Sequence, residues 1–201
     1  MLKKGERGDG MDKLAVLRQY FGFPAFRAGQ QTLIDAVLSG RDALGVMPTG
    51  GGKSLCYELP ALLLPGMTLV VSPLISLMKD QVMALRNAGI PAGCINSSMS
   101  LDELRETYRD ARYGAYKLLY VAPERLLTDG FCSLAQELEI PLVAVDEAHC
   151  ISQWGQDFRP SYLKIVEFLQ RLPRRPAVAA FTATATAQVR ADIIRILQLH
   201  E

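Results

Sequence analysis

The feature that most constrains the fold of this chain is a glycine run that ends in Lys-Ser, MPTGGGKS at residues 47–54. The apolar run 42–46 precedes it and reads as a buried strand, and a helix-like pattern follows over 55–62. Glycines let the main chain wrap closely round phosphate oxygens, with backbone N–H groups and a helix N-terminus facing the negative charge. Strand, loop and helix in this order predict a P-loop for a nucleoside triphosphate.

The chemistry of a P-loop assigns roles within this segment. Lys53 would reach the β and γ phosphates of ATP, and the Ser54 hydroxyl would ligate Mg²⁺. The backbone of Thr49, Gly50, Gly51 and Gly52 would surround the phosphates. Met47 stands where the pattern GxxxxGK[ST] has its first glycine, so a glycine-rich turn that binds nothing is the alternative.

A second motif, Asp146-Glu147-Ala148-His149, would supply the metal ligand and the catalytic base. The continuous apolar run 140–145 before it is typical of a strand covered on both faces, and ligands bind at the carboxyl ends of such strands. Asp146 could then hold Mg²⁺, and Glu147 could orient or deprotonate the attacking water, with His149 counted among the catalytic residues. The alternative is the acidic first turn of a helix, favoured by the helix dipole.

Strand-like and helix-like runs alternate along the whole chain, which indicates an α/β fold with a mostly parallel sheet and helices on both faces. About seven strands are expected. Ser100 with Glu103 predicts a capping box, and Gly89 and Gly114 follow predicted helices. The strands we place are 42–47, 67–72, 91–95, 117–122, 140–146 and 177–182, and the helices are 12–21, 27–39, 53–64, 74–88, 100–112, 161–171 and 186–198.

Composition indicates an ordinary globular protein. With 201 residues, 49% of them hydrophobic, the chain can bury a sizeable core, and we expect a single domain over 1–201 with residues 1–10 disordered. No leader-like segment or membrane-length apolar run is found, so we expect a cytoplasmic protein, as in a bacterial cytoplasm or nucleoid. The 4 cysteines lie far apart without a CxxC pair and are expected to be buried thiols rather than zinc ligands. The net charge of +1 does not favour or exclude a polyanionic partner.

With two nucleotide motifs placed, the remaining unusual segments resemble the first, RecA-like motor domain of RecQ-type DNA helicases of superfamily two. The resemblance covers almost the whole chain, and the tryptophan-containing segment directly after DEAH is its most specific part. The matching segments are Phe21-Gly22-Phe23 with Phe26, Arg27 and Gln30, MPTGGGKS at 47–54, VVSPLISLMKDQV at 70–82, YVAPERL at 120–126, VDEAHCISQWGQDFRP at 145–160 and FTATAT at 181–186.

The resemblance implies an adenine site before the P-loop. Phe23 and Arg27 would sandwich the base, and Gln30 would hydrogen-bond its edge through the paired donor and acceptor of the amide. Without the resemblance, Phe23 and Phe26 would read as core residues and Gln30 as a surface amide.

The segment 150–160 resembles an aromatic-rich loop in which Trp154, Phe158 and Arg159 face single-stranded DNA. Aromatic faces stack on bases without reading sequence, each worth about 1–3 kcal/mol. A packed Trp154 that anchors the DEAH segment is the alternative. Gln156 stands where the family usually has histidine.

Further coupling residues follow from the same resemblance. Ser72 and Pro73, and Glu124 and Arg125 after Pro123, would hold the DNA backbone at strand ends. Simple turns are the alternative for both segments. Thr182 and Thr184 would relay between the nucleotide and DNA sites, although by composition alone they are β-branched strand residues.

The resemblance therefore implies an ATP- and Mg²⁺-dependent 3′ to 5′ DNA helicase acting on single-stranded and partly duplex DNA in repair and recombination. We expect the second RecA-like domain, the zinc domain and the winged-helix domain to be absent from this chain, so that it hydrolyses ATP weakly and does not unwind DNA alone. Two alternatives stay open. An RNA helicase of the DEAH type would share both nucleotide motifs, and a non-catalytic module would bind nucleotide or a protein partner without turnover.

Overall fold

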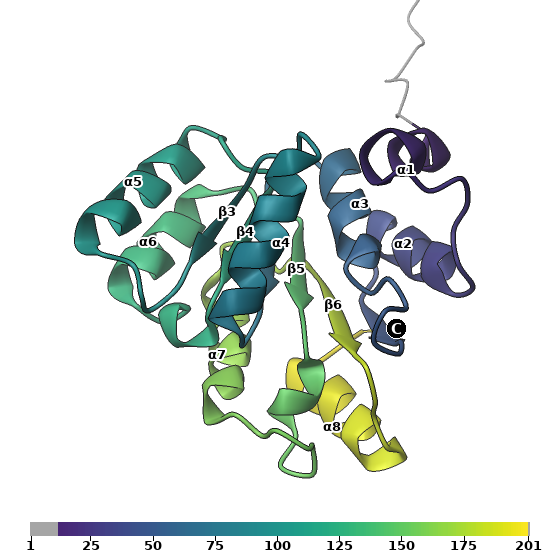
Figure 1. Ribbon diagram of the computed structural model, residues 1–201. Helices are drawn as coiled ribbons and strands as arrows, with labels where there is room; N and C mark the ends of the chain where they lie inside the picture. The colour runs from purple at the N-terminus through teal and green to yellow at the C-terminus, as the bar shows by residue number, and fades with distance from the viewer. Residues whose placement is uncertain (1–11, 201) are drawn as a thin grey trace, which may run out of the picture.

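A six-stranded, entirely parallel sheet forms the centre of the molecule, with strand order β1-β6-β5-β2-β4-β3. The computed structural model describes residues 12–200, so the expected disorder of residues 1–10 lies outside the described residues. The strands are β1 (Ala43–Val46), β2 (Thr68–Val71), β3 (Ala92–Ile95), β4 (Leu118–Val121), β5 (Leu142–Val145) and β6 (Ala177–Thr182). Figure 1 shows them fanned with the usual twist, and the α/β class predicted from the alternating pattern is confirmed.

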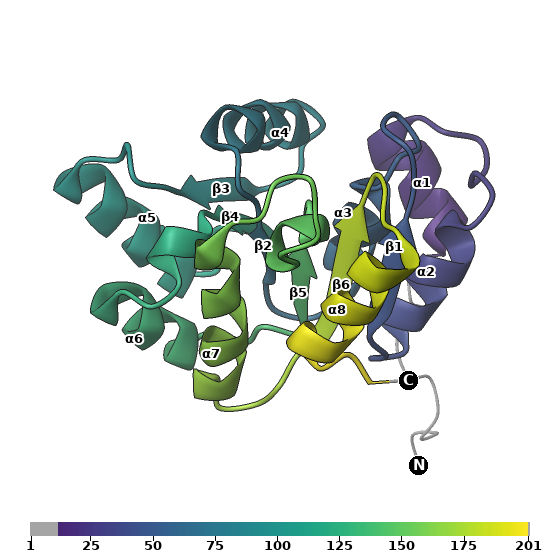
Figure 2. The ribbon, with the colours of Figure 1, turned by 90° about the horizontal axis from the view of Figure 1, so that it is seen from below.

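Helices cover both faces of this sheet. They are α1 (Lys13–Phe21), α2 (Gln30–Leu38), α3 (Leu55–Leu63), α4 (Ile75–Asn87), α5 (Leu101–Arg112), α6 (Asp129–Glu137), α7 (Lys164–Arg171) and α8 (Ala187–Leu197). Short 3₁₀ turns lie at η1 (Pro123–Arg125), η2 (Ala148–Ile151) and η3 (Pro160–Leu163). In Figure 2, α3 and α4 lie above the sheet, and α6, α7 and α8 lie below it. No described helix has the length and apolar character needed to cross a membrane.

The side chains of the central strands point alternately to the two faces of the sheet and form two separate hydrophobic cores. Val70 of β2 belongs to the core that includes residues of α1, α2, α3 and α4, whereas its neighbours Leu69 and Val71 belong to the core that includes residues of α6, α7 and α8. Successive side chains of a strand point to opposite faces, so a continuous apolar run is needed when both faces are covered. All four residues of β2, β4 and β5 are buried, as this rule requires.

The seven predicted helices are all present, within a few residues at their ends, and the predicted punctuation is confirmed. Ser100 and Glu103 form the capping box of α5, and Gly89 and Gly114 have φ of 78° and 72° just beyond α4 and α5. One helix was missed. In α6 the apolar residues Phe131, Leu134 and Ala135 carry the core face, but Gly130 and the short length hide this pattern.

Two further expectations need correction. The sheet of the described residues has six strands rather than about seven. Only two of the cysteines, Cys56 and Cys150, are buried, whereas Cys94 and Cys132 are half-buried free thiols. Cys94 lies on β3, which pairs only with β4 in the part of the chain that the structure describes and is an edge strand of that sheet.

Asp42, just before β1, connects three parts of the chain through its buried carboxylate. Its side chain is only 2% exposed and pairs with Arg175 at 2.7 Å. It also accepts hydrogen bonds from the backbone N–H groups of Val178 and His200, each at 2.7 Å. One carboxylate therefore joins the starts of β1 and β6 to the segment that follows α8.

We expect Asp42→Ala to lower the free energy of unfolding by about 2–4 kcal/mol at pH 7, because buried N–H groups and Arg175 lose their partner. Burial acts to raise the pKa of Asp42, but the hydrogen bonds from Arg175, His200 and Val178 leave it below its usual value. A lowered carboxyl pKa stabilises the fold above the unfolded-state pKa, and this stabilisation is lost as the pH falls through the folded-state value.

The difference in the free energy of unfolding between wild type and Asp42→Ala, measured in urea, should therefore become smaller as the pH falls from about 5 to about 2. Asp102→Ala is the matched control, because the Asp102 side chain is 93% exposed, and it should change stability by less than about 0.5 kcal/mol. Equal stability of Asp42→Ala and wild type at pH 7 would contradict this assignment.

Candidate nucleotide and nucleic-acid site

The glycine run forms the loop between β1 and α3 that its sequence predicted. Gly50 and Gly52 have φ of 77° and 79°, a region that side-chain-bearing residues rarely adopt. The Gly51 N–H donates to the Pro48 carbonyl at 2.8 Å and tightens the turn. The Met47 N–H donates to the Thr182 carbonyl at 3.0 Å, so the loop begins while β1 still pairs with β6.

Gln30 and Arg27 hold this loop from outside. Gln30 is 2% exposed, and its Nε2 donates to the Gly52 carbonyl at 3.1 Å while its Oε1 accepts from the Arg27 N–H at 2.8 Å. Arg27 Nη1 donates to the Gly50 carbonyl. These donors neutralise carbonyl oxygens that would otherwise repel a phosphate. Gln30 is thus a buried residue rather than a surface amide, and its contact with adenine stays a prediction.

Residues of the loop, the segment before it and the end of β5 line one cavity of about 480 Å³. Phe23 is 46% exposed at its rim, so it is not a core residue, whereas Phe26 is half-buried and packs on the core. The predicted nucleotide residues that line the cavity are Phe23, Arg27, Gln30, Thr49, Gly50, Gly52, Lys53, Ser54, Asp146 and Glu147. The structure therefore gathers the predicted P-loop and DEAH residues around one space.

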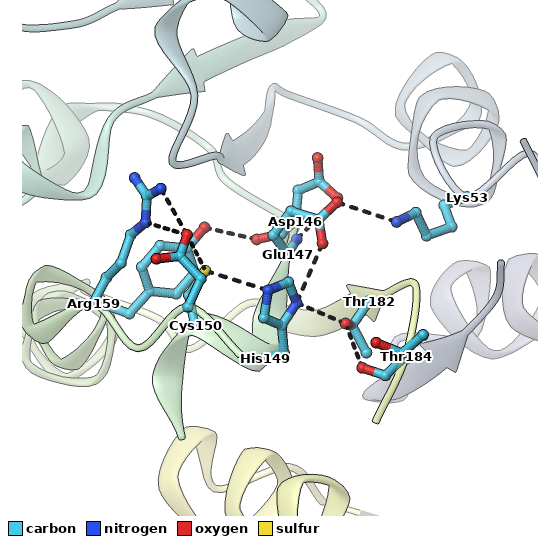
Figure 3. Close-up of polar contacts among 10 residues, drawn as sticks. Lys53, Asp146, Glu147, His149, Cys150, Arg159, Thr182 and Thr184 are labelled. Carbon is cyan, nitrogen blue, oxygen red and sulfur yellow. Dashed lines mark hydrogen bonds and ion pairs between the residues drawn. The ribbon is translucent and has the colours of Figure 1, made fainter. Parts of the chain in front are cut away.

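Lys53 and Glu147 meet across the cavity, although 94 residues separate them (Figure 3). Lys53 Nζ lies 3.2 Å from Glu147 Oε1, and His149 Nδ1 lies 3.3 Å from Glu147 Oε2. Both carboxylate oxygens are thus paired with nitrogen donors. The hydrogen bond from His149, followed by the charge of Lys53, keeps the pKa of Glu147 below its usual value against the effect of burial. Glu147 is therefore ionised at neutral pH.

Glu147 also has unusual backbone geometry. Its φ is 47°, and Gln198 is the only other described non-glycine residue with a positive φ. Such conformations cost about 1–3 kcal/mol and persist where surrounding contacts enforce them. The Glu147 N–H donates to Asp146 Oδ1 at 3.0 Å, and the Asp146 carbonyl accepts from the Tyr162 hydroxyl at 2.8 Å. These contacts fix the direction in which the two acidic side chains leave β5.

Asp146 lies deeper than Glu147 and is 5% exposed. Burial and the charge of Glu147 raise the pKa of Asp146 to about 6, with Lys53 acting in the opposite direction. A third carboxyl group, Glu58 of α3, lines the same cavity, and burial raises its pKa to about 7. Glu58 Oε1 accepts from the Tyr120 hydroxyl at 3.3 Å. No sequence pattern marks Glu58 as a site residue, because its position resembles that of an ordinary helix residue.

These residues suit ATP with Mg²⁺. Buried carboxyl groups and a hydroxyl are the hard oxygen donors that Mg²⁺ prefers, and a cation beside Asp146 would relieve the cost of ionising it in a buried place. Ser54 and Asp146, which both line the cavity, would hold the metal. Lys53 and the glycine backbone would hold the phosphates.

His149 connects this cavity to the end of β6. Its Nδ1 lies 2.9 Å from Thr182 Oγ1, and the Thr182 hydroxyl donates to the Thr184 carbonyl at 3.0 Å (Figure 3). Because the hydroxyl proton is used on Thr184, the Thr182 oxygen accepts from His149, which places a proton on Nδ1 that Thr182 Oγ1 and Glu147 Oε2 share. Thr182 is fully buried, and Thr184 is exposed. Hydrogen bonds thus link the predicted relay residues to the DEAH segment.

The aromatic-rich loop follows η2 and presents Trp154 to solvent with 74% of its surface exposed. Trp154 is therefore not the packed anchor that was the alternative. Phe158 is half-buried, and Arg159 is held by Asp157 at 2.7 Å and by the Pro73 carbonyl at 3.1 Å. That last contact ties the loop to the segment after β2.

The other predicted DNA residues lie at carboxyl ends of strands. Ser72 is fully buried beyond β2, and its hydroxyl has no partner among the described residues. Glu124 is exposed in η1, and Arg125 Nε donates to the Asn96 carbonyl at 3.2 Å. Pro123 is buried at the start of that turn. The structure places these residues on the same edge as the nucleotide cavity and leaves their contacts with DNA as predictions.

Sequence comparison matches residues 27–193 to the family model described as DEAD/DEAH box helicase. The chain is 52% identical over 187 residues to the ATP-dependent DNA helicase RecQ of Bacillus subtilis (strain 168), covering 92% of this chain and 31% of that protein. It is 49% identical to RecQ of Haemophilus influenzae, covering 92% of this chain and 30% of that protein. The chain thus spans less than a third of the length of these two curated relatives.

Solved structures of helicases share the fold at low sequence identity. A crystal structure of the DUF1998 helicase MrfA superposes with a TM-score of 0.75 at 18% identity, covering 96% of this chain and 32% of that chain. The Pyrococcus furiosus Hef helicase domain gives a TM-score of 0.68 at 19% identity, covering 92% of this chain and 38% of that chain. These likenesses support the RecA-like domain fold predicted from the sequence.

The His149 ring provides a test of the charge arrangement. Contacts with the Cys150 sulfur and with the Glu147 carboxylate raise the pKa of His149 to about 9. We therefore expect His149 to be cationic at neutral pH and to titrate near pH 9 in NMR spectra. His200 is the only other histidine, so His200→Gln identifies the signal.

Glu147→Gln should lower the pKa of His149, because it removes the neighbouring negative charge. A folded-state pKa above the unfolded value of about 6.5 stabilises the fold below pH 6.5, and this stabilisation is lost as the pH rises through about 9. A His149 that titrates near 6.5 in both proteins would contradict the geometry.

Proposed function

We propose, since this chain belongs to the DEAD/DEAH box helicase family, that it is the ATP-binding motor domain of a RecQ-type DNA helicase. In this proposal it binds ATP with Mg²⁺ and couples hydrolysis to single-stranded DNA. The observation that carries it is the polar chain from Lys53 through Glu147 and His149 to Thr182, which runs from the P-loop to the end of β6.

Several residues of the nucleotide cavity would have distinct tasks in this reaction. Mg²⁺, held by Ser54 and Asp146, would neutralise charge that develops on the transferring phosphoryl group. Lys53 would leave Glu147 and bind the phosphates, and its side chain is 14% exposed toward the cavity. Phe23 and Arg27 would hold the adenine between them, because both line the rim of the same space.

Glu147 would orient and deprotonate the attacking water. Departure of Lys53 from Oε1 frees one carboxylate oxygen to accept a proton from water, while Oε2 stays paired with His149. Lys53 therefore controls when the base is available, which links nucleotide binding to hydrolysis. His149 would hold the carboxylate in position and stabilise it in the ionised form.

DNA would cross the edge of the sheet where the strands end. The exposed face of Trp154 suits stacking on a base, and Arg159 and the segment after β2 suit contacts with phosphates. Thr182 and Thr184 would pass changes at His149 to this edge. We also propose 3′ to 5′ polarity, cooperation with a second RecA-like domain and a cytoplasmic location, all in line with the resemblance to RecQ helicases.

Nucleotide binding is the direct test. We expect the purified chain to bind ATP only weakly without Mg²⁺, and Lys53→Ala to weaken binding of ATP with Mg²⁺ by about tenfold to a hundredfold, the value of a hydrogen bond to a charged group. Glu147→Gln should bind about as well as wild type, because its role begins after binding. Equal binding by wild type and Lys53→Ala, measured by calorimetry, would refute the nucleotide site.

Turnover tests the catalytic assignment. We expect slow hydrolysis that Glu147→Gln abolishes, and no unwinding of duplex DNA by the 201 residues, because an arginine from a second motor domain is worth about 10³–10⁵ in turnover. Lys53→Ala reports any contaminating activity. Robust strand separation by this chain would show that it needs no second domain.

A further inference from the structure

Helix α8 packs against η2, just before the loop that carries Trp154, and a buried hydrogen bond joins the helix to the loop itself. Ser152 Oγ donates to Asp192 Oδ2 at 2.7 Å, across 40 residues of sequence. Ser152 is fully buried and Asp192 is 6% exposed. A buried carboxylate and a buried hydroxyl both lose free energy when unpaired, so each holds the other in place.

The same hydroxyl group also holds the backbone of Trp154 in place. Ser152 Oγ accepts the Trp154 N–H at 3.2 Å, while its own proton goes to Asp192. The next residue, Gly155, donates its N–H to the Ser152 carbonyl at 2.9 Å and leaves no room for a side chain, since a Cβ there would lie 2.2 Å from the His149 carbonyl oxygen. The exposed indole is therefore carried by a turn whose central contact is Ser152 with Asp192.

Helix α8 begins at the other half of the site. Thr186 caps it by accepting the Val189 N–H at 3.3 Å, directly after the Thr182 and Thr184 relay. A cavity of about 290 Å³ lies between Trp154 on one side and Thr184 and Val189 on the other. The loop is thus separated from the first turn of α8 by open space and is joined to the helix further along, at Asp192. Figure 1 shows the segment after β5 beside α8.

We infer that Asp192 is a positioning residue that fixes the Trp154 loop to helix α8, so that nucleotide-linked movement of the Thr182–Thr186 segment and DNA-linked movement of the loop become one motion. The inference rests on the proposed function. The Ser152–Asp192 contact gives the loop a second connection to the segments around the nucleotide cavity, in addition to the contact between His149 and Thr182. Coupling between two ligands requires an element that both ligands bias, and α8 with the loop is that element.

Trp154 is the only tryptophan of the chain, so its fluorescence reports the loop. The experiment titrates single-stranded oligonucleotide into the chain and follows Trp154 emission, with and without a non-hydrolysable ATP analogue and Mg²⁺. The ratio of the two DNA affinities is the coupling factor, expected to be about fivefold or more for wild type. Ser152→Ala should bring this ratio to within about twofold of unity, because the hydrogen bond between the loop and Asp192 of α8 is lost.

Three further variants separate positioning from stability. Asp192→Asn keeps an acceptor for Ser152 and should retain the wild-type ratio. Arg195→Ala removes the ion pair that Arg195 makes with the other Asp192 oxygen at 2.9 Å, without touching the loop, and should also retain it. The double variant Ser152→Ala with Asp192→Ala removes both partners, so it should remain folded and still lose the coupling.

The outcomes distinguish failure of the proposed function from failure of the inference about Asp192. A wild-type ratio of unity, or no DNA binding, would overturn the proposed coupling function and this inference with it. If wild type shows a ratio of about fivefold or more, and Ser152→Ala and the double variant show the same ratio, the inference alone is overturned. This holds whatever the melting temperatures of the variants are. Loss of coupling in those two variants, with retention in Asp192→Asn and Arg195→Ala, would support it.

Discussion

The arrangement of this molecule depends on the pairing of β6 between β1 and β5. Parallel hydrogen bonding on both sides of β6 places the ends of three strands side by side, with Val46 beside Thr182 and Val145 beside Ala180. The P-loop, the relay threonines and the DEAH segment all begin at those ends. A parallel sheet puts the carboxyl ends of all its strands on one edge. This order of strands therefore brings the site segments together although they are far apart along the chain.

Charge is balanced tightly at that edge. Lys53 and His149 neutralise Glu147 from two sides, and Asp146 and Glu58 sit deeper with raised pKa values. This arrangement concentrates oxygen donors where a divalent cation would bind and keeps the base ionised where water would be activated. Backbone geometry and chemistry meet at this edge, because Asp146 also accepts the N–H of Glu147, whose backbone is left-handed.

The sequence predicted the fold class and, within residues 12–200, all six strands and seven of the eight helices, because continuous apolar runs and helix caps are local signals. It also predicted the P-loop and the acidic pair, whose chemistry needs adjacent residues. It failed at α6, where Gly130 and the short length weaken the periodicity, and it did not show that Gln30 contacts the loop carbonyls. It passed over Glu58, Ser152 and Asp192, because single polar residues within helices or turns carry no pattern.

Sequence alone determined which residues can cradle a phosphate, hold a metal or stack on a base, because those properties belong to residue types and their spacing along the chain. Tertiary structure decided which of them meet. Lys53 reaches Glu147 across 94 residues, and Ser152 reaches Asp192 across 40. Such contacts depend on strand order and on the packing of helices against each face of the sheet, which no local spacing encodes, so only the folded chain joins the nucleotide edge to the Trp154 loop.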